Sequence, residues 1–192
     1  MTALIAGLVL FLGVHSVRIL AEPWRGTMLA KLGEKGYKGL YSIASLVGLV
    51  LLVWGFGQAR QQPVPLWPAM AWARHLAGLL MLLSFVLLAA AYVPGNTIKA
   101  RLHHPMMLGV KVWAFAHLLA NNTLGDTVFF GAFLVWSVLA FRAARARDRA
   151  AGTVYAAGRT GPTVTAALIG IVAWAVFAFW GHVLVVGVRP FG

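Results

Sequence analysis

Residues 103–122 form an apolar stretch that nevertheless holds three histidines and a lysine. Ionisable side chains inside a membrane are costly and usually mark a functional site. His104 and Lys111 are seven residues apart, or two turns of a helix, so they share a face and can bind an anionic group such as a carboxylate or a phosphate. His117 lies on a different face, together with Trp113. One helix is therefore predicted to present a basic face and a second face with an imidazole beside an indole.

A neutral imidazole is a good ligand for iron, zinc or copper, and haem iron takes axial histidines. A zinc site needs three or four close ligands. The chain has no cysteine, and its four acidic residues lie in predicted loops or at helix ends. A hydrolytic zinc site and a mechanism with paired carboxylates are thus poorly supported. Haem needs only one or two histidines and an apolar aromatic pocket, although a purely structural role for the histidines remains open.

The other polar side chains in apolar segments allow simpler interpretations. Arg18, at the end of the first segment, can extend its stem to the membrane interface, and His75 follows Arg74 at the outer end of another segment. His182, in FWGHVLVV, either hydrogen-bonds across a pair of helices or serves as a ligand. Lys111 lies roughly 10 Å of helix away from the interface, which makes an extended stem a poor explanation for it.

The composition indicates a membrane protein. Of the 192 residues, 61% are hydrophobic and only 10% are charged, whereas soluble chains are roughly half apolar and about a quarter charged. The net charge of +12 lies in short loops between apolar runs and forms no continuous stripe, which argues against nucleic acid as a partner and for a lipid bilayer.

Six segments are candidates for crossing a hydrocarbon core of ~30 Å, which takes about 20 helical residues. We expect them to form one all-α membrane domain, residues 1–192, built as a six-transmembrane-helix bundle. The turn NNTLGD is predicted to close a tight helical hairpin, with Asp126 or Thr127 as the N-cap of the next helix. The segments are 2–20, 39–57, 71–92, 105–121, 127–142 and 163–187.

The lysines and arginines predict the orientation. Twelve lie in the first, third and fifth connections or at the adjoining helix ends, and three lie on the opposite side. Because cytoplasmic loops carry the excess of positive charge, both termini should be periplasmic. The basic run FRAARARDRAAG should lie against anionic lipid headgroups. The first apolar run lacks a basic start and a small-residue cleavage site, so we take it as part of the mature chain rather than a signal peptide.

Three segments carry a resemblance to a known family: LFLGVHSVR, KGYKGLYSIASLVGL and HPMMLGVKVWAFAHLLANN. They resemble the NnrU family of bacterial membrane proteins, which is related to the 15-cis-zeta-carotene isomerase of plants and cyanobacteria. The resemblance covers residues 1 to about 145, with the motifs in the expected order. It implies a multi-pass protein of the bacterial inner membrane.

NnrU proteins are associated with denitrification and nitric oxide metabolism, and the related isomerase holds a haem b through histidines. The resemblance implies haem b ligation by His15 and His117, with His104 opening the second motif. Independently of the resemblance, the positions of Lys111 and Trp113 on the same helix as His117 predict that they complete the cofactor site. The resemblance also implies haem-dependent redox chemistry or a related isomerisation, with a small apolar or gaseous ligand.

Two features complicate the haem site. Ala114 stands where the isomerase has a cysteine, which puts a switch of iron ligands in doubt. His15 is predicted near the cytoplasmic end of its helix, whereas His117 lies about 20 Å along its helix from His104. His182 is therefore kept as a substitute ligand.

Two other functions remain open. The chain can be a non-catalytic membrane factor that supports assembly or expression of nitric oxide reductase. Alternatively, HHPMMLG resembles the RHPxYxG-like motif of membrane methyltransferases of the isoprenylcysteine and phospholipid type, although no glutamate follows in the segment after the fifth predicted helix. The substrate, the electron donor and the oligomeric state are not indicated.

Overall fold

The computed structural model describes residues 1–191, and all its regular elements in that range are helices. Two isolated backbone bridges join loops and helix ends. The elements, in chain order, are α1 (Thr2–Leu20), α2 (Glu22–Gln61), α3 (Ala71–Tyr92), α4 (Thr97–Leu102), α5 (Pro105–Ala120), α6 (Leu124–Ala150), α7 (Thr160–Val176), the π-helix η1 (Phe177–Gly181) and α8 (His182–Val186).

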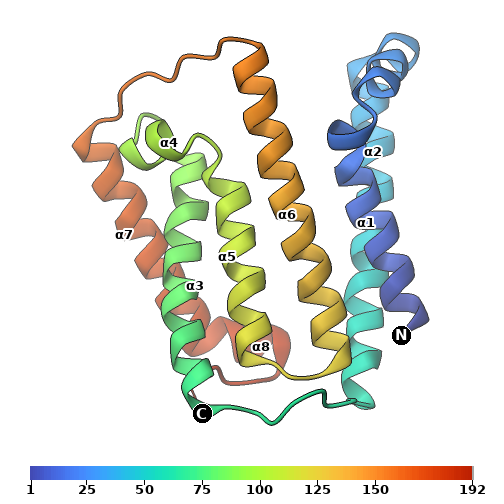
Figure 1. Ribbon diagram of the computed structural model, residues 1–192, viewed down its shortest axis with the longest axis vertical. Coiled ribbons are helices and arrows are strands. Elements are labelled where there is room, and N and C mark those ends of the chain that lie inside the picture. Colours follow the sequence, from blue (N-terminus) through green and yellow to red (C-terminus); the bar gives the residue numbers. More distant parts are fainter. Residues whose placement is uncertain (192) are drawn as a thin grey trace.

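The long helices stand side by side in a single row (Figure 1). The order across the row is α7, α3, α5, α6 and then the hairpin of α1 and α2. In residues 1–191 the extensive contacts all join neighbours in this order, and the α1–α2 hairpin meets the other helices mainly through α6. Many large apolar side chains therefore remain exposed on both sides of the row, as expected of helices that pack against lipid.

Five helices are long and apolar enough to span a membrane: α1, α2, α3, α6 and the continuous segment Thr160–Val186. The prediction of an all-α membrane protein is confirmed. Helix α5 is apolar but has only 16 residues, or about 24 Å at 1.5 Å per residue. It starts at Pro105, two residues after His103, which adopts a left-handed φ of 66°. The sixth span and the periplasmic placement of both termini remain predictions.

Two helices extend well beyond the predicted segments. Helix α2 begins at Glu22 instead of residue 39, although Gly33, with φ 69° and ψ 168°, breaks its regular geometry. Helix α6 continues to Ala150 through most of the basic run that was predicted as a loop. Alanine and arginine are among the strongest helix formers, so this run continues the helix despite its charge.

The predicted N-cap of α6 was wrong. Thr123, not Asp126 or Thr127, caps this helix: its side-chain oxygen accepts a hydrogen bond from the Asp126 N–H at 3.2 Å. The Asp126 carboxylate accepts in return from the Thr123 N–H at 3.4 Å. This reciprocal capping box satisfies two backbone donors at once, which a cap at either predicted residue would leave unpaired.

Glycines allow α1 and α2 to pack with their backbones in contact. A Cβ on Gly55 would lie 2.3 Å from the backbone nitrogen of Leu4, and a Cβ on Gly7 would lie 2.5 Å from that of Leu52. Leu4, Leu8 and Leu52 form the buried core of this pair. Without a hydrophobic driving force between helices in lipid, such close packing of small residues is what holds membrane helices together.

Candidate functional site

His15 lies half-buried on α1, and its tautomer is fixed locally. Its Nδ1–H donates to the carbonyl oxygen of Phe11 at 2.7 Å. The ring also contacts the rings of Phe11, Tyr41 and Trp136, with centroid distances of 4.3, 5.3 and 6.2 Å. Because Nδ1 holds the proton of the neutral imidazole, Nε2 carries the free lone pair.

His117, near the end of α5, repeats this arrangement. Its Nδ1–H donates to the carbonyl oxygen of Trp113 at 2.9 Å. The ring stacks on Phe130 of α6 at 4.6 Å and contacts Trp113 at 5.4 Å. Both predicted ligands thus have Nδ1 bonded to a carbonyl oxygen and Nε2 available, which is the usual state of a histidine that binds a metal.

Aromatic side chains fill the space between the two histidines. Phe11, beside His15, contacts Phe133 of α6 at 6.0 Å, and Phe133 contacts Trp113, beside His117, at 5.3 Å. The residues of α6 that contact the two imidazoles, Trp136 and Phe130, are six positions apart, or about 9 Å along the helix. The difference in depth is therefore smaller than the sequence suggested.

His182 lies close to His117 but in different surroundings. It is the first residue of α8, directly after the π-helix, and its Nδ1–H donates to the carbonyl oxygen of Val188 at 2.6 Å. The charges of His182 and Asp126 both act on His117 electrostatically. π-Helical turns occur frequently at functional sites, and the role of His182 as a substitute ligand remains a prediction.

The predicted basic pair of His104 and Lys111 is not joined by a direct contact. Lys111 is half-buried on α5, and within residues 1–191 it has no hydrogen bond and no ion pair. The His104 Nε2–H instead donates to the Asp148 carboxylate at 2.7 Å. An intramembrane lysine that lacks an internal partner still fits the predicted role of binding an anionic group.

A second polar cluster joins the start of α5 to the far end of α6. Asp148 accepts hydrogen bonds from His104 and, at 2.8 Å, from the Tyr155 hydroxyl in the loop after α6. The His103 ring stacks on Tyr155 at 3.9 Å, and its buried Nδ1 has no partner. Burial, followed by the hydrogen bond to Asp148 and its charge, raises the pKa of the Tyr155 phenol.

Sequence reasoning missed Asp148 and Tyr155 as members of this cluster. The available signal was a single carboxylate within a run of arginines, FRAARARDRAAG. Asp148 is 44 residues from His104, so no local spacing could have paired them.

Asp148→Asn should lower the pKa of the Tyr155 phenol towards its ordinary value of 10.0, because the variant lacks the acceptor charge. In the native protein the raised pKa means that this contact stabilises the fold at pH values below that value, and that the contribution is lost as the pH rises through the raised pKa. An ultraviolet titration, with Tyr155→Phe to identify the signal, measures the shift. A Tyr155 titration that is the same with and without the Asp148 carboxylate would contradict the assignment.

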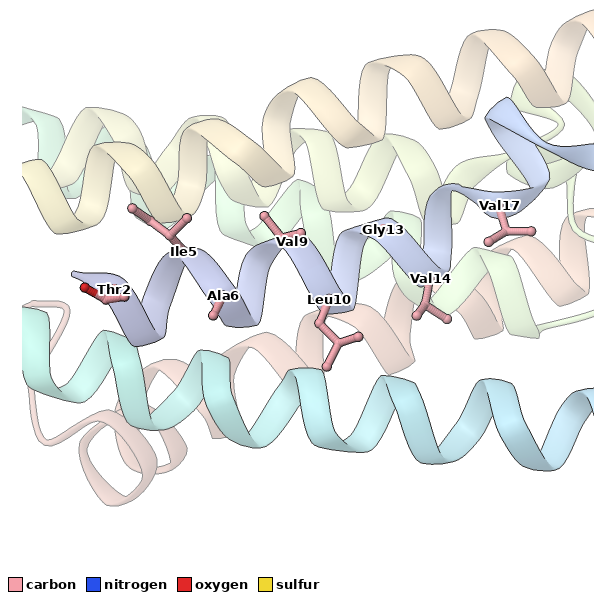
Figure 2. Close-up of a pocket in the computed structure, with 8 residues that line it drawn as sticks. All are labelled: Thr2, Ile5, Ala6, Val9, Leu10, Gly13, Val14 and Val17. Carbon is pink, nitrogen blue, oxygen red and sulfur yellow. The ribbon is translucent and has the colours of Figure 1, made fainter.

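The donor atoms of these residues suit a haem, but their side chains occupy the space that the haem would need. Two imidazoles have free Nε2 atoms, the surroundings are aromatic, and Lys111 offers a cation. The side chains of Phe133 and Trp113 would have to move for one haem to reach both histidines. Two open hollows, with volumes of about 720 and 670 Å³, are lined by neither histidine: the first lies on α1, and the second lies between α1 and α6. Figure 2 shows the first, which α1 alone lines. Within residues 1–191 no three His, Cys, Asp or Glu residues are placed to hold a metal ion.

Together, the row of apolar helices and the polar groups placed within it define a multi-pass α-helical membrane protein. A family model described as NnrU protein matches residues 3–190, nearly the whole chain, so the chain belongs to the NnrU family. This confirms the family expected from the sequence motifs, whereas the relation to carotene isomerase stays a prediction. No curated protein and no solved structure matches the chain.

Proposed function

We propose that this NnrU-family protein binds haem b inside the membrane through His15 and His117. The observation that carries the proposal is the shared local geometry of the two histidines. Each donates its Nδ1–H to the carbonyl oxygen four residues earlier on its own helix, and each leaves Nε2 free. The two imidazoles do not contact each other, yet both have the tautomer and the free Nε2 atom that a metal ligand needs.

The surrounding residues have defined parts in this proposal. Phe130 and Trp113 hold the His117 ring and keep water from it, and Lys111 supplies a cation for a haem propionate. A bound haem would provide one-electron redox chemistry and a site for a small gaseous ligand such as nitric oxide. His15 and His117 would both hold the iron, so a small molecule would need one of them to give up its position.

A haem spectrum tests the proposal directly. Protein expressed with adequate haem and purified in detergent should show a low-spin b-type spectrum. Protein that stays colourless after reconstitution with haem would contradict the proposal and favour the non-catalytic factor for nitric oxide reductase. The methyltransferase alternative gains no support from the start of α5, where Asp148 engages the Nε2 of His104.

The placement of basic residues supports a proposed orientation of the chain in the bacterial inner membrane. The Arg147 guanidinium, near the end of α6, donates to the carbonyl oxygen of Arg18, near the end of α1, at 3.2 Å. The basic ends of α1 and α6 therefore lie together, at the same end of the row of helices. We assign these basic helix ends to the cytoplasmic surface of the membrane, with both termini in the periplasm. Protease protection of a tag at either terminus in right-side-out vesicles would contradict the assignment.

Lys111→Met should lower haem retention, because it keeps the apolar stem and removes the only charge that α5 offers within its length. Lys111→Arg is the matched control, since it keeps the positive charge and should retain haem. Haem per protein after detergent washing is the measurement. Equal haem content in the methionine variant and the native protein would exclude an anion-binding role for Lys111.

A further inference from the structure

The first part of α2, Glu22–Leu32, is a separate helical unit. Glu22 and Pro23 occupy its first turn, where an acidic side chain and a proline favour helix initiation. Gly33, with its positive φ, then turns the chain into the membrane-spanning part of α2. In Figure 1 this segment, in blue, curls over the end of the α1–α2 hairpin.

This helical unit has an apolar face that the protein leaves uncovered. Trp24, Met28 and Leu32 are spaced four residues apart, so they lie along one side of the helix. Trp24 is 51% exposed and Leu32 is 47% exposed. Gly26 and Ala30 lie on the opposite side, and both are exposed. The segment therefore presents a ridge of large apolar side chains, with the half-buried Met28 between the exposed Trp24 and Leu32, opposite a face of small residues.

The charges beside the apolar face are positive. The two acidic residues here are already paired, Glu22 with Arg25 and Glu34 with Lys38. Lys31 and Lys35 are exposed and have no ion pair within residues 1–191. The surface of the segment thus carries a net positive charge and is complementary to an anionic partner.

We propose that Glu22–Leu32 lies in the plane of the membrane surface, where Lys31 of this segment and Lys35, just after the break at Gly33, bind anionic lipid headgroups. Trp24 and Leu32 insert among the acyl chains beneath them. The partner is the bilayer rather than another protein, because the segment joins two membrane-spanning helices and is held at the level of the headgroups. Basic amphipathic helices bind anionic bilayers in this manner, and each lysine near such a surface strengthens binding by about fivefold.

Spin labelling can test this placement, since the chain has no cysteine to remove. Trp24→Cys and Leu32→Cys place nitroxides on the apolar face. Gly26→Cys and Ala30→Cys are matched controls on the opposite face, and a Cβ at residue 26 meets no atom within 4 Å. Each variant is reconstituted in nanodiscs of phosphatidylcholine with or without phosphatidylglycerol. Collision of the nitroxide with oxygen and with a water-soluble nickel chelate then reports its depth.

With phosphatidylglycerol present, we expect labels at residues 24 and 32 to collide mainly with oxygen and the control labels mainly with the nickel chelate. Replacing both Lys31 and Lys35 with Gln should move the first two labels towards water. Labels at 24 and 32 that are as accessible to nickel as the controls would overturn the membrane insertion. Equal depth in both lipid mixtures, unaffected by the glutamine variant, would overturn the recognition of anionic headgroups. Neither outcome depends on whether the protein binds haem.

Discussion

Replacing His117 with alanine is expected to remove haem from the protein or to leave high-spin iron. The reason is that the variant loses a ligand whose Nε2 is free and whose ring Phe130 and Trp113 hold in place. His15→Ala should have the same effect. The loss of affinity should exceed the roughly 10–100-fold that follows when only an outer partner of a metal ligand is removed. Visible spectra and haem content of the purified variants measure both effects.

His75→Ala is the control for these variants. His75 is exposed near the start of α3, and its replacement should leave the spectrum unchanged. His182→Ala decides between the two possible partners of His117. If His182→Ala removes haem and His15→Ala does not, then His117 pairs with His182, and the ligand assignment carried over from the isomerase is wrong.

Gly55→Ala is expected to destabilise the protein severely. The new methyl carbon would lie 2.3 Å from the Leu4 nitrogen and 2.6 Å from the Ala3 carbonyl carbon, so the backbones of α1 and α2 must separate. Overpacking typically costs 1–3 kcal/mol and occasionally more. A clash with backbone should lie at the upper end of that range, about 3 kcal/mol. Thermal unfolding in detergent, followed by loss of the monodisperse peak, measures the change.

Gly57→Ala is the matched control on the same helix. A Cβ at residue 57 meets no atom within 4 Å, and alanine favours helix over glycine by up to about 1 kcal/mol. This variant should be as stable as the native protein or more stable. Equal thermal stability of the Gly55 and Gly57 variants would show that the close approach of α1 and α2 does not hold the hairpin together.

The sequence predicted the long apolar helices well, because their ends coincide with charged residues, prolines and glycines. The predicted bounds of the first and third segments agree with α1 and α3. The helix at Glu22–Leu32 was missed because a proline, a glycine and three charged residues interrupt its apolar residues, as in a loop. The extension of α6 to Ala150 was missed for a similar reason.

The candidate site could be predicted only in part. His15 and His117 stand out because histidine is rare in apolar helices, and their bonds to Phe11 and Trp113 are local. The pairing of His104 with Asp148 depends on how α5 packs against α6 and the loop that follows it. Side-chain spacing within one helix places residues on a face but cannot say which neighbour that face meets. This is why Lys111 was placed on a face with His104 although His104 has a different partner.

The single row of helices determines how other molecules can approach the site. A closed bundle surrounds its interior on all sides, and a ligand must enter it through a portal. Here the broad sides of the row face the acyl chains, and α6, the helix beside both histidines, has α5 on one flank and α1 on the other. If the proposed ligand is a small apolar molecule dissolved in the bilayer, it would diffuse laterally to this region without first crossing an aqueous channel. Its concentration there follows its partition into lipid rather than its concentration in water.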